Sequence, residues 1–163
     1  MSSKYSVVLA LAALTLIFVH PPVQAQDRPV QLALIAPVQI FPENDPISGI
    51  RLNLIYGRNV SVTGLDLGLI NHTTTGMTKG LQFGLVGLAD TDFLGWQDNW
   101  VNVTKGKFEG LQWGAVNYSS SMNGFQLGVV NYAESMHGLQ VGLVNIIRVG
   151  GVLPVLPIIN WSF

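Results

Sequence analysis

The chain lacks cysteine and carries few charges. The absence of cysteine among its 163 residues excludes disulfides, thiolate metal sites and cysteine nucleophiles. Charged residues make up only 10% of the chain, against roughly 25% in ordinary soluble domains. A net charge of −1 offers no basic surface to nucleic acid, so we expect no nucleic-acid partner. The polar surfaces of this protein must therefore be built from amides, hydroxyls and glycine.

Long apolar runs are also missing after residue 25. The first 25 residues combine a basic start, an apolar run from Val7 to Val19, a proline pair and a small-residue ending at Ala25. This order is typical of a cleaved signal peptide, because the run is shorter than the roughly 20 residues of a membrane-spanning helix. We therefore expect residues 1–25 to direct export to the cell surface, the outer membrane or the periplasm.

What the sequence does contain is repetition. The phrase Gly-Phe-Gln-Leu-Gly-Val-Val-Asn, which begins at Gly124, returns fourteen residues later as Gly-Leu-Gln-Val-Gly-Leu-Val-Asn. Counting looser copies, the phrase begins seven times, at Gly49, Gly64, Gly80, Gly95, Gly110, Gly124 and Gly138. A period of 14 to 16 residues predicts stacked repeats that stabilise one another.

Each copy alternates between two kinds of side chain. Counted from its glycine, positions two, four and six are mostly large and apolar, whereas positions three and five are polar or glycine and position eight is usually asparagine. Alternation with a period of two predicts a β-strand of about eight residues. In stacked coils the amides would form ladders along the axis, namely Gln82, Gln97, Gln112, Gln126 and Gln140, with Asn102, Asn117, Asn131 and Asn145.

Two finer features refine this unit. Repeated glycine at position five indicates the close approach of a neighbouring segment, because glycine inside a strand is otherwise unfavourable. The turn-like stretch between copies often carries one apolar residue, at Val62, Phe108, Met122 and Met136. We interpret this residue as the inward side chain of a second short strand.

The repeats divide the chain into four parts. After the signal peptide, residues 26–48 are predicted to form an N-terminal capping strand and turn. Residues 49–148 hold the seven copies. Residues 149–163 are predicted to form a C-terminal cap strand, whose two prolines place it at an edge.

Two all-β architectures fit this single repetitive domain best. The favoured one is a parallel β-solenoid, because a period of one copy gives every coil the same surroundings. The alternative is an up-and-down outer-membrane β-barrel of eight or nine strands, which the low charge and the C-terminal Trp161-Ser-Phe163 suit. Two observations argue against the barrel. Asp98 would face lipid, and the repeat strands are shorter than the roughly 9–11 residues of a membrane-spanning β-strand. A β-sandwich is a third and less favoured arrangement.

The repeat phrase, with the segment from Ile50 to Asn59 and the ending from Pro157 to Phe163, resembles a group of uncharacterised bacterial exported proteins with surface repeats. The resemblance covers roughly Leu32 to Phe163. It implies export and repetition, and it brings no catalytic residues with it. A shorter stretch, Gln126 to Ala133, is similar to the Gln-x-Gly-x-x-Asn-x-Ala core of curli fibre subunits, which favours stacked coils.

Residues suited to chemistry or binding are few. The candidate interaction region lies where the repeat is least regular and comprises Asp90, Asp92, Trp96, Asp98 and Trp100. The spacing of its aspartates differs from that of an EF-hand loop, so a solvated turn is favoured over a calcium site. Both histidines of the mature chain are expected in turns, and neither has a second ligand at metal-binding spacing. We expect no metal and no cofactor.

Three tryptophans, Trp96, Trp100 and Trp113, occupy apolar positions of adjacent copies and should share one face. In a solenoid we expect them in the core, and in a barrel against lipid. A sugar- or partner-binding platform is the less favoured alternative.

These features predict an exported, non-enzymatic surface repeat protein that acts as a structural or adhesive scaffold at the bacterial cell envelope. The alternative is a small outer-membrane β-barrel acting as an anchor or pore. The partner is not identified by the sequence. An outer-membrane or cell-surface partner and self-association are both compatible with it.

Overall fold

The structure, a computed structural model, describes residues 28–163 and is all-β over this range. Its strands are β1 (Arg28–Ile35), β2 (Val38–Gln39), β3 (Ile47–Asn59), β4 (Val62–Thr73), β5 (Thr78–Ala89), β6 (Phe93–Val149) and β7 (Val155–Ser162). They follow one another in the sheet order β2-β1-β3-β4-β5-β6-β7. The predicted signal peptide, residues 1–25, lies outside the described residues. Residues 28–163 contain no helix that is long and apolar enough to cross a membrane.

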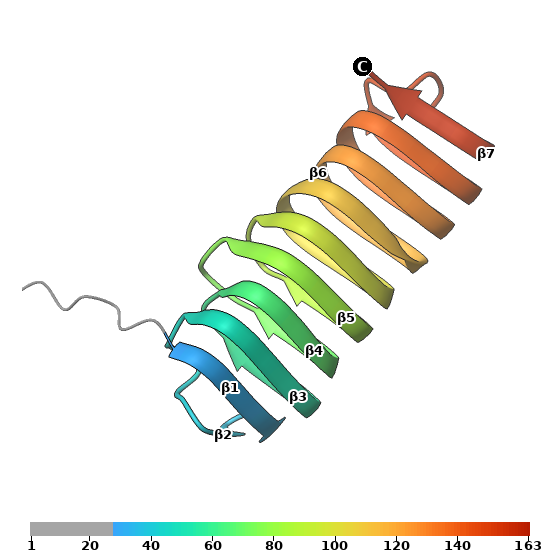
Figure 1. The fold of residues 1–163 in the computed structure, drawn as a ribbon. Helices are drawn as coiled ribbons and strands as arrows, with labels where there is room; N and C mark the ends of the chain where they lie inside the picture. Colours follow the sequence, from blue (N-terminus) through green and yellow to red (C-terminus); the bar gives the residue numbers. More distant parts are fainter. Residues whose placement is uncertain (1–27) are drawn as a thin grey trace, which may run out of the picture.

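Successive copies run in the same direction and stack in register. The first glycines of neighbouring copies are partners, Gly49 with Gly64, Gly64 with Gly80, and Gly80 with Gly95. The ribbon of β6 continues the same winding through the last four copies (Figure 1). The parallel β-solenoid is therefore confirmed. The up-and-down barrel is not adopted, because it requires neighbouring strands of opposite direction.

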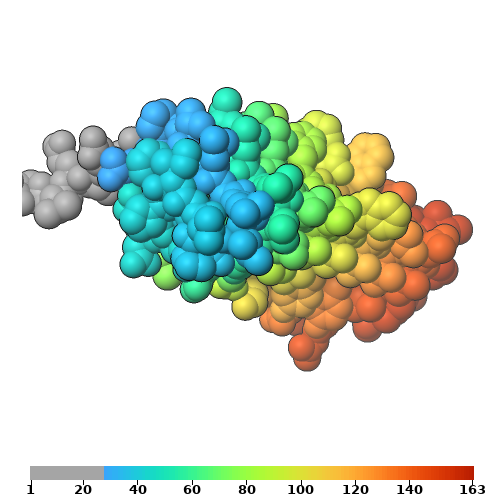
Figure 2. All heavy atoms as spheres, turned by 90° about the horizontal axis from the view of Figure 1, so that it is seen from below, coloured from blue at the N-terminus to red at the C-terminus, as the bar shows by residue number. Residues whose placement is uncertain are grey.

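The two ends of the solenoid differ from its middle. At the N-terminal end β1 pairs in parallel with β3, and the short β2 pairs antiparallel with β1. At the C-terminal end β7 reverses direction and pairs antiparallel with the last coil, Gly138 opposite Ser162. Figure 2 shows the coils following one another from the blue end to the red end of the body. A reversed strand with Pro157 in it ends the parallel stacking.

Glycine at position one is required by the backbone. All seven of these glycines have φ between 126° and 146°, a region that side chains other than hydrogen rarely adopt. A Cβ atom on Gly124 would also clash with the carbonyl oxygen of Gly110, at 2.1 Å. The other glycines at position one would clash in the same way with the preceding coil. Position five is equally tight, since a Cβ on Gly114 would meet the carbonyl oxygen of Asn99. The predicted close approach at position five is thus observed.

The amides of positions three and eight point into the solenoid. Gln97 Nε2 donates to Gln82 Oε1 at 2.9 Å, and the same bond links each later glutamine to the one before it. In the asparagine row, Asn117 Nδ2 donates to Asn131 Oδ1 at 2.8 Å. An amide carries both donors and acceptors, so identical side chains stacked at one coil spacing satisfy one another. These ladders supply hydrogen-bond partners to amides that are fully buried.

The glutamine ladder ends at a buried ion pair. Gln82 Nε2 donates to Asp66 Oδ2 at 2.8 Å, and Asp66 in turn accepts from Arg51 Nε at 2.7 Å and from Arg51 Nη2 at 2.8 Å. Both charged side chains are buried. The bidentate pair replaces the amide-to-amide bond in the first two copies, because the guanidinium fork matches the two carboxylate oxygens.

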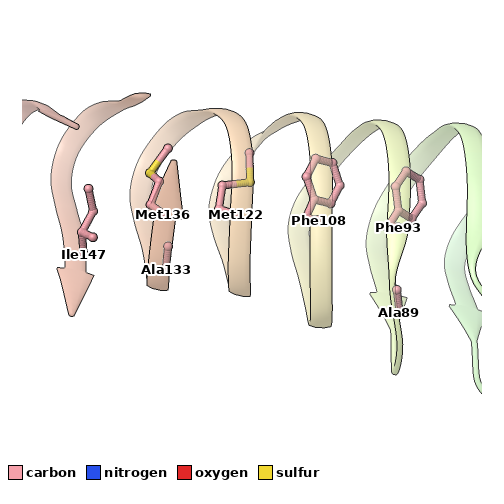
Figure 3. Close-up of a cluster of buried hydrophobic side chains, with 7 residues drawn as sticks. All are labelled: Ala89, Phe93, Phe108, Met122, Ala133, Met136 and Ile147. Atoms are coloured by element: carbon pink, nitrogen blue, oxygen red, sulfur yellow. The ribbon is translucent and has the colours of Figure 1, made fainter. Parts of the chain in front are cut away.

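The apolar part of the interior comes from the second strand of each copy. Phe93, Phe108, Met122 and Met136 follow one another along the axis with Ala89, Ala133 and Ile147 beside them (Figure 3). The rings of Phe93 and Phe108 stack with centroids 5.3 Å apart. The inward residues predicted for a second strand, Val62, Phe108, Met122 and Met136, are all buried.

The expected placement of the large apolar residues of the first strand is wrong. Trp100 is 70% exposed and Trp113 is 53% exposed, so neither lies in the core. Alternation shows that a strand has two different faces, but it does not say which face is inside. In this coil the glutamine and asparagine rows occupy the inside, where stacking satisfies their amides, and the leucines, valines and tryptophans therefore point outward.

Candidate functional site

One outer surface of the solenoid is apolar along its whole length. It is formed by positions two, four and six of each copy, which we call the apolar face. Many of these side chains are largely exposed, including Leu54 and Leu143. The apolar face comprises Ile50, Leu65, Leu81, Trp96, Leu111, Phe125 and Leu139, then Leu52, Leu67, Phe83, Asp98, Trp113, Leu127 and Val141, and finally Leu54, Leu69, Leu85, Trp100, Ala115, Val129 and Leu143.

The opposite outer surface is mainly polar. The second strand and the turns beside it present Thr75, Lys105 and Glu134 to solvent, together with a few exposed apolar residues such as Met77 and Leu94. The solenoid is therefore amphipathic across its width. At about 3.3 Å per residue and about 4.8 Å per coil, seven coils give an apolar face of roughly 16 Å by 34 Å. This area of about 550 Å² is near the upper limit of the apolar patches that monomers leave exposed.

The structure divides the five residues of the predicted interaction region between the two surfaces. Trp96, Asp98 and Trp100 lie on the apolar face, at alternate positions of one strand whose intervening residues are buried. Asp90 and Asp92 lie in the turn between β5 and β6. The carboxylates therefore do not form one cluster. No group of three or more histidine or acidic residues within residues 28–163 is placed to hold a metal ion.

Asp98 is surrounded by aromatic residues. Phe83 is its register partner on one neighbouring coil. Trp113 occupies the same position on the other neighbouring coil, because Gly114 stacks on the backbone of Asn99. Trp96 and Trp100 flank Asp98 along its own strand, and the ring of Trp96 contacts that of Phe83 with centroids 5.6 Å apart. Within residues 28–163, Asp98 is the one charged side chain of the apolar face, and its carboxylate makes no hydrogen bond or ion pair with that part of the chain.

A shallow depression of about 480 Å³ lies beside Asp98. Trp100 and Trp113 line it, and Gly114, Ala115 and Gly128 provide small residues around it. Ala115 stands where other copies carry leucine, valine or tryptophan, so the column of side chains is interrupted at this point. A few polar groups among apolar ones are the lining that sites for small ligands usually have.

A second constellation lies on the polar surface. Tyr56, His72, Asp90 and Lys105 come from four successive copies and form a line of hydrogen bonds. His72 Nδ1 lies 2.8 Å from the Tyr56 hydroxyl, and His72 Nε2 lies 2.8 Å from Asp90 Oδ2. Lys105 Nζ is 2.7 Å from Asp90 Oδ1. Burial raises the pKa of the Tyr56 hydroxyl. The hydrogen bond from Lys105, with a smaller contribution from His72, holds the pKa of Asp90 below its usual value.

The remaining predicted residues have local partners. Asp92 Oδ1 accepts a hydrogen bond from the backbone N–H of Lys107 at 2.7 Å, which fixes the turn between two copies. The ring of His137 contacts that of Phe163 edge to face. Sequence reasoning missed Phe83 as a neighbour of Asp98 and Tyr56 as a partner of His72. The repeat register contained the signal for Phe83, since both residues occupy position four of adjacent copies.

By its fold the protein is a parallel β-solenoid, with amide ladders inside and an apolar outer face interrupted by one carboxylate. No family model matches the chain, and no curated protein or solved structure matches it either.

Proposed function

We propose that this protein is an exported, non-enzymatic repeat protein that serves as a structural or adhesive scaffold at the bacterial cell envelope, lying on a lipid surface through its apolar face. The observation that carries the proposal is the continuity of the apolar face over all seven copies, opposite a polar surface. Exposing this face to water throughout the life of the protein would be unfavourable by about 25 cal/mol per Å². A flat amphipathic body removes that cost by lying in the interface between water and lipid.

The residues of the apolar face suit a membrane interface. Binding of amphipathic elements to bilayers scales with the apolar area that they bury. Trp100 and Trp113 are among the exposed aromatic residues of the face, and the indole ring with its polar N–H favours the headgroup level. A single acidic residue such as Asp98 costs only about 0–1 kcal/mol near an interface.

A second copy of the chain is a less favourable partner at neutral pH. Asp98 lies in the fourth of seven copies, and therefore at the middle of the apolar face. A two-fold dimer that overlaps the full face places copy four against copy four, whether the two solenoids run parallel or antiparallel. Two carboxylates would then meet in an apolar interface, where like charges repel strongly.

The polar surface does not favour an enzyme. The line of Tyr56, His72 and Asp90 resembles a nucleophile with its base and orienting acid. However, the raised pKa of Tyr56 disfavours the phenolate that such a nucleophile would need. The neighbouring cavity of about 130 Å³ is also smaller than typical substrate pockets, which hold roughly 300–1,000 Å³.

The proposal is tested by sedimenting the mature protein with vesicles of zwitterionic phosphatidylcholine and, separately, of anionic phosphatidylglycerol. The test variant carries Leu54→Glu and Leu143→Glu, at side chains that are already 65% and 70% exposed. The matched control carries Thr75→Glu and Ser135→Glu on the polar surface, with the same change in charge. We expect wild type and control to bind vesicles and the test variant to bind at least about tenfold more weakly, since two large apolar contacts are lost.

Two results would contradict the proposal. The first is a wild-type protein that stays in the supernatant with both kinds of vesicle. The second is an equal loss of binding in the test variant and in the control, because binding would then not depend on which surface of the solenoid is altered.

A further inference from the structure

The carboxylate of Asp98 is unusual at its place in the repeat. Position four of the other six copies carries Leu52, Leu67, Phe83, Trp113, Leu127 and Val141, all of them apolar. Asp98 alone brings a charge into this column, and it finds no partner among the described residues. Packing and ladder formation do not require the charge, because the side chain points away from the interior.

Most aromatic residues of the apolar face gather around this carboxylate, and Phe125 is the exception. Three of the four tryptophans of the chain, Trp96, Trp100 and Trp113, are its neighbours. Phe83 completes the surroundings through its register with Asp98. The depression between Trp100 and Trp113 leaves room above Ala115 for a group of several heavy atoms. The carboxylate and two exposed indole rings therefore border the same space.

We propose that Asp98, Trp100 and Trp113 form a binding site for an alkylated ammonium group. A cation is attracted to the faces of indole rings within about 6 Å of the ring centre, and aromatic surroundings with an acidic residue recognise such ions. The carboxylate supplies the counter-charge, while the apolar neighbours contact the alkyl substituents. The site uses the one charge of the apolar face and the opening left by Ala115.

A neutral sugar fits the same surface less well. Sugars present several hydroxyl groups that need hydrogen-bond partners as well as a ring to stack on. The Asn99 side chain is engaged inside the coil, where its Nδ2 donates to Asn102 Oδ1 at 2.7 Å and to Gln82 Oε1 at 3.3 Å. The Asn99 Oδ1 atom has no partner but is buried, so Asp98 is the side chain that presents accessible acceptors to the depression.

The ammonium group has two sources with the same chemistry, a free organic cation and the headgroup of a zwitterionic lipid. The second source rests on the proposed function, since the apolar face would then lie against headgroups. The site is argued from Asp98 and its neighbours, whereas the attachment to lipid is argued from the whole face. Choline titration therefore tests the site, vesicle binding tests the proposed function, and one can fail while the other succeeds.

The first experiment titrates the full-length mature protein with choline and follows tryptophan fluorescence and calorimetric heat. We expect saturable binding of choline, and binding at least about tenfold weaker for its uncharged carbon isostere, dimethylbutanol. Asp98→Asn should weaken choline binding at least about tenfold, and Trp113→Leu several-fold. The matched control Trp161→Phe changes the fourth tryptophan, at the C-terminal strand, and should bind choline like the wild type. Unchanged urea-unfolding midpoints show that the variants are folded.

The second experiment compares phosphatidylcholine with phosphatidylglycerol vesicles. If the lipid headgroup is the source, the wild type prefers phosphatidylcholine about tenfold and Asp98→Asn loses this preference while still binding phosphatidylglycerol. Choline binding without vesicle binding assigns the site to a free cation and contradicts the proposed function alone. Equal affinity for choline and dimethylbutanol, or undiminished choline binding in folded Asp98→Asn, overturns the site.

Discussion

Replacing Asp66 by asparagine should lower the free energy of unfolding by about 3–5 kcal/mol, the range for breaking a buried ion pair. Asp66 accepts two bonds from Arg51, at 2.7 Å and 2.8 Å, and a third from Gln82 at 2.8 Å. Both members of the pair are buried, so the variant leaves a guanidinium without its counter-charge. With a urea m-value of about 2 kcal/mol/M, the midpoint of unfolding should fall by roughly 2 M.

The double variant Arg51→Gln with Asp66→Gln tests the reasoning behind this number. It continues the glutamine ladder that links Gln82 to Gln140, so both positions again satisfy each other. We expect it to be more stable than Arg51→Gln alone or Asp66→Gln alone, giving a favourable coupling in the double-mutant cycle of these variants. Arg58→Gln is the matched control, because Arg58 forms an exposed pair with Glu43 at 3.1 Å and should cost at most about 1 kcal/mol. A loss below about 1 kcal/mol for Asp66→Asn, or strictly additive single changes, would falsify the account.

Three further predictions follow from the coil geometry and the polar line. Gly124→Ala should destabilise the protein by more than about 1 kcal/mol in urea unfolding, because φ is 134° and the new Cβ meets the Gly110 carbonyl; a smaller loss contradicts the stacking. Lys105→Gln should raise the pKa of Asp90 towards its usual value in a carboxyl NMR titration. Because the folded pKa of Asp90 is lowered, its stabilising contribution is present above the usual aspartate value of about 3.9 and disappears as the pH falls through the folded value. An unchanged titration would show that Lys105 does not hold the carboxylate. Ending the chain at Gly150 removes β7 and exposes the edge of the last coil, so light scattering should detect association; a monomer would contradict the capping role of β7.

Much of the fold was predictable because each copy stacks on the next and must therefore have the same kinds of residue at the same positions. The period, the Gln and Asn rows, the close approach at position five and the inward residues such as Phe108 are all local or periodic properties. The ion pair of Arg51 and Asp66 was not recognised, although both residues occupy position three of the first two copies. Their pairing depends on two neighbouring departures from glutamine, which look like random variation until the two copies are laid against each other in space.

For the candidate site, less could be predicted from the sequence and more depended on the three-dimensional structure. Sequence irregularity alone pointed to Asp90, Asp92, Trp96, Asp98 and Trp100 as one region. The coil separates them, because residues on the first strand of a copy and residues on its second strand lie on opposite outer surfaces. The register then adds Phe83 and Trp113 to the surroundings of Asp98 and adds Tyr56 and His72 to those of Asp90.

The sequence by itself determined that this protein repeats a glycine-led strand seven times and that each strand has an apolar face and an amide face. A period of two is sufficient for that conclusion, since it depends only on the pleat of the chain. Only the tertiary structure decided which face is inside. Because successive coils stack in register, the amides of one coil meet those of the next and satisfy one another inside, and the apolar face with Asp98 at its centre is left on the outside.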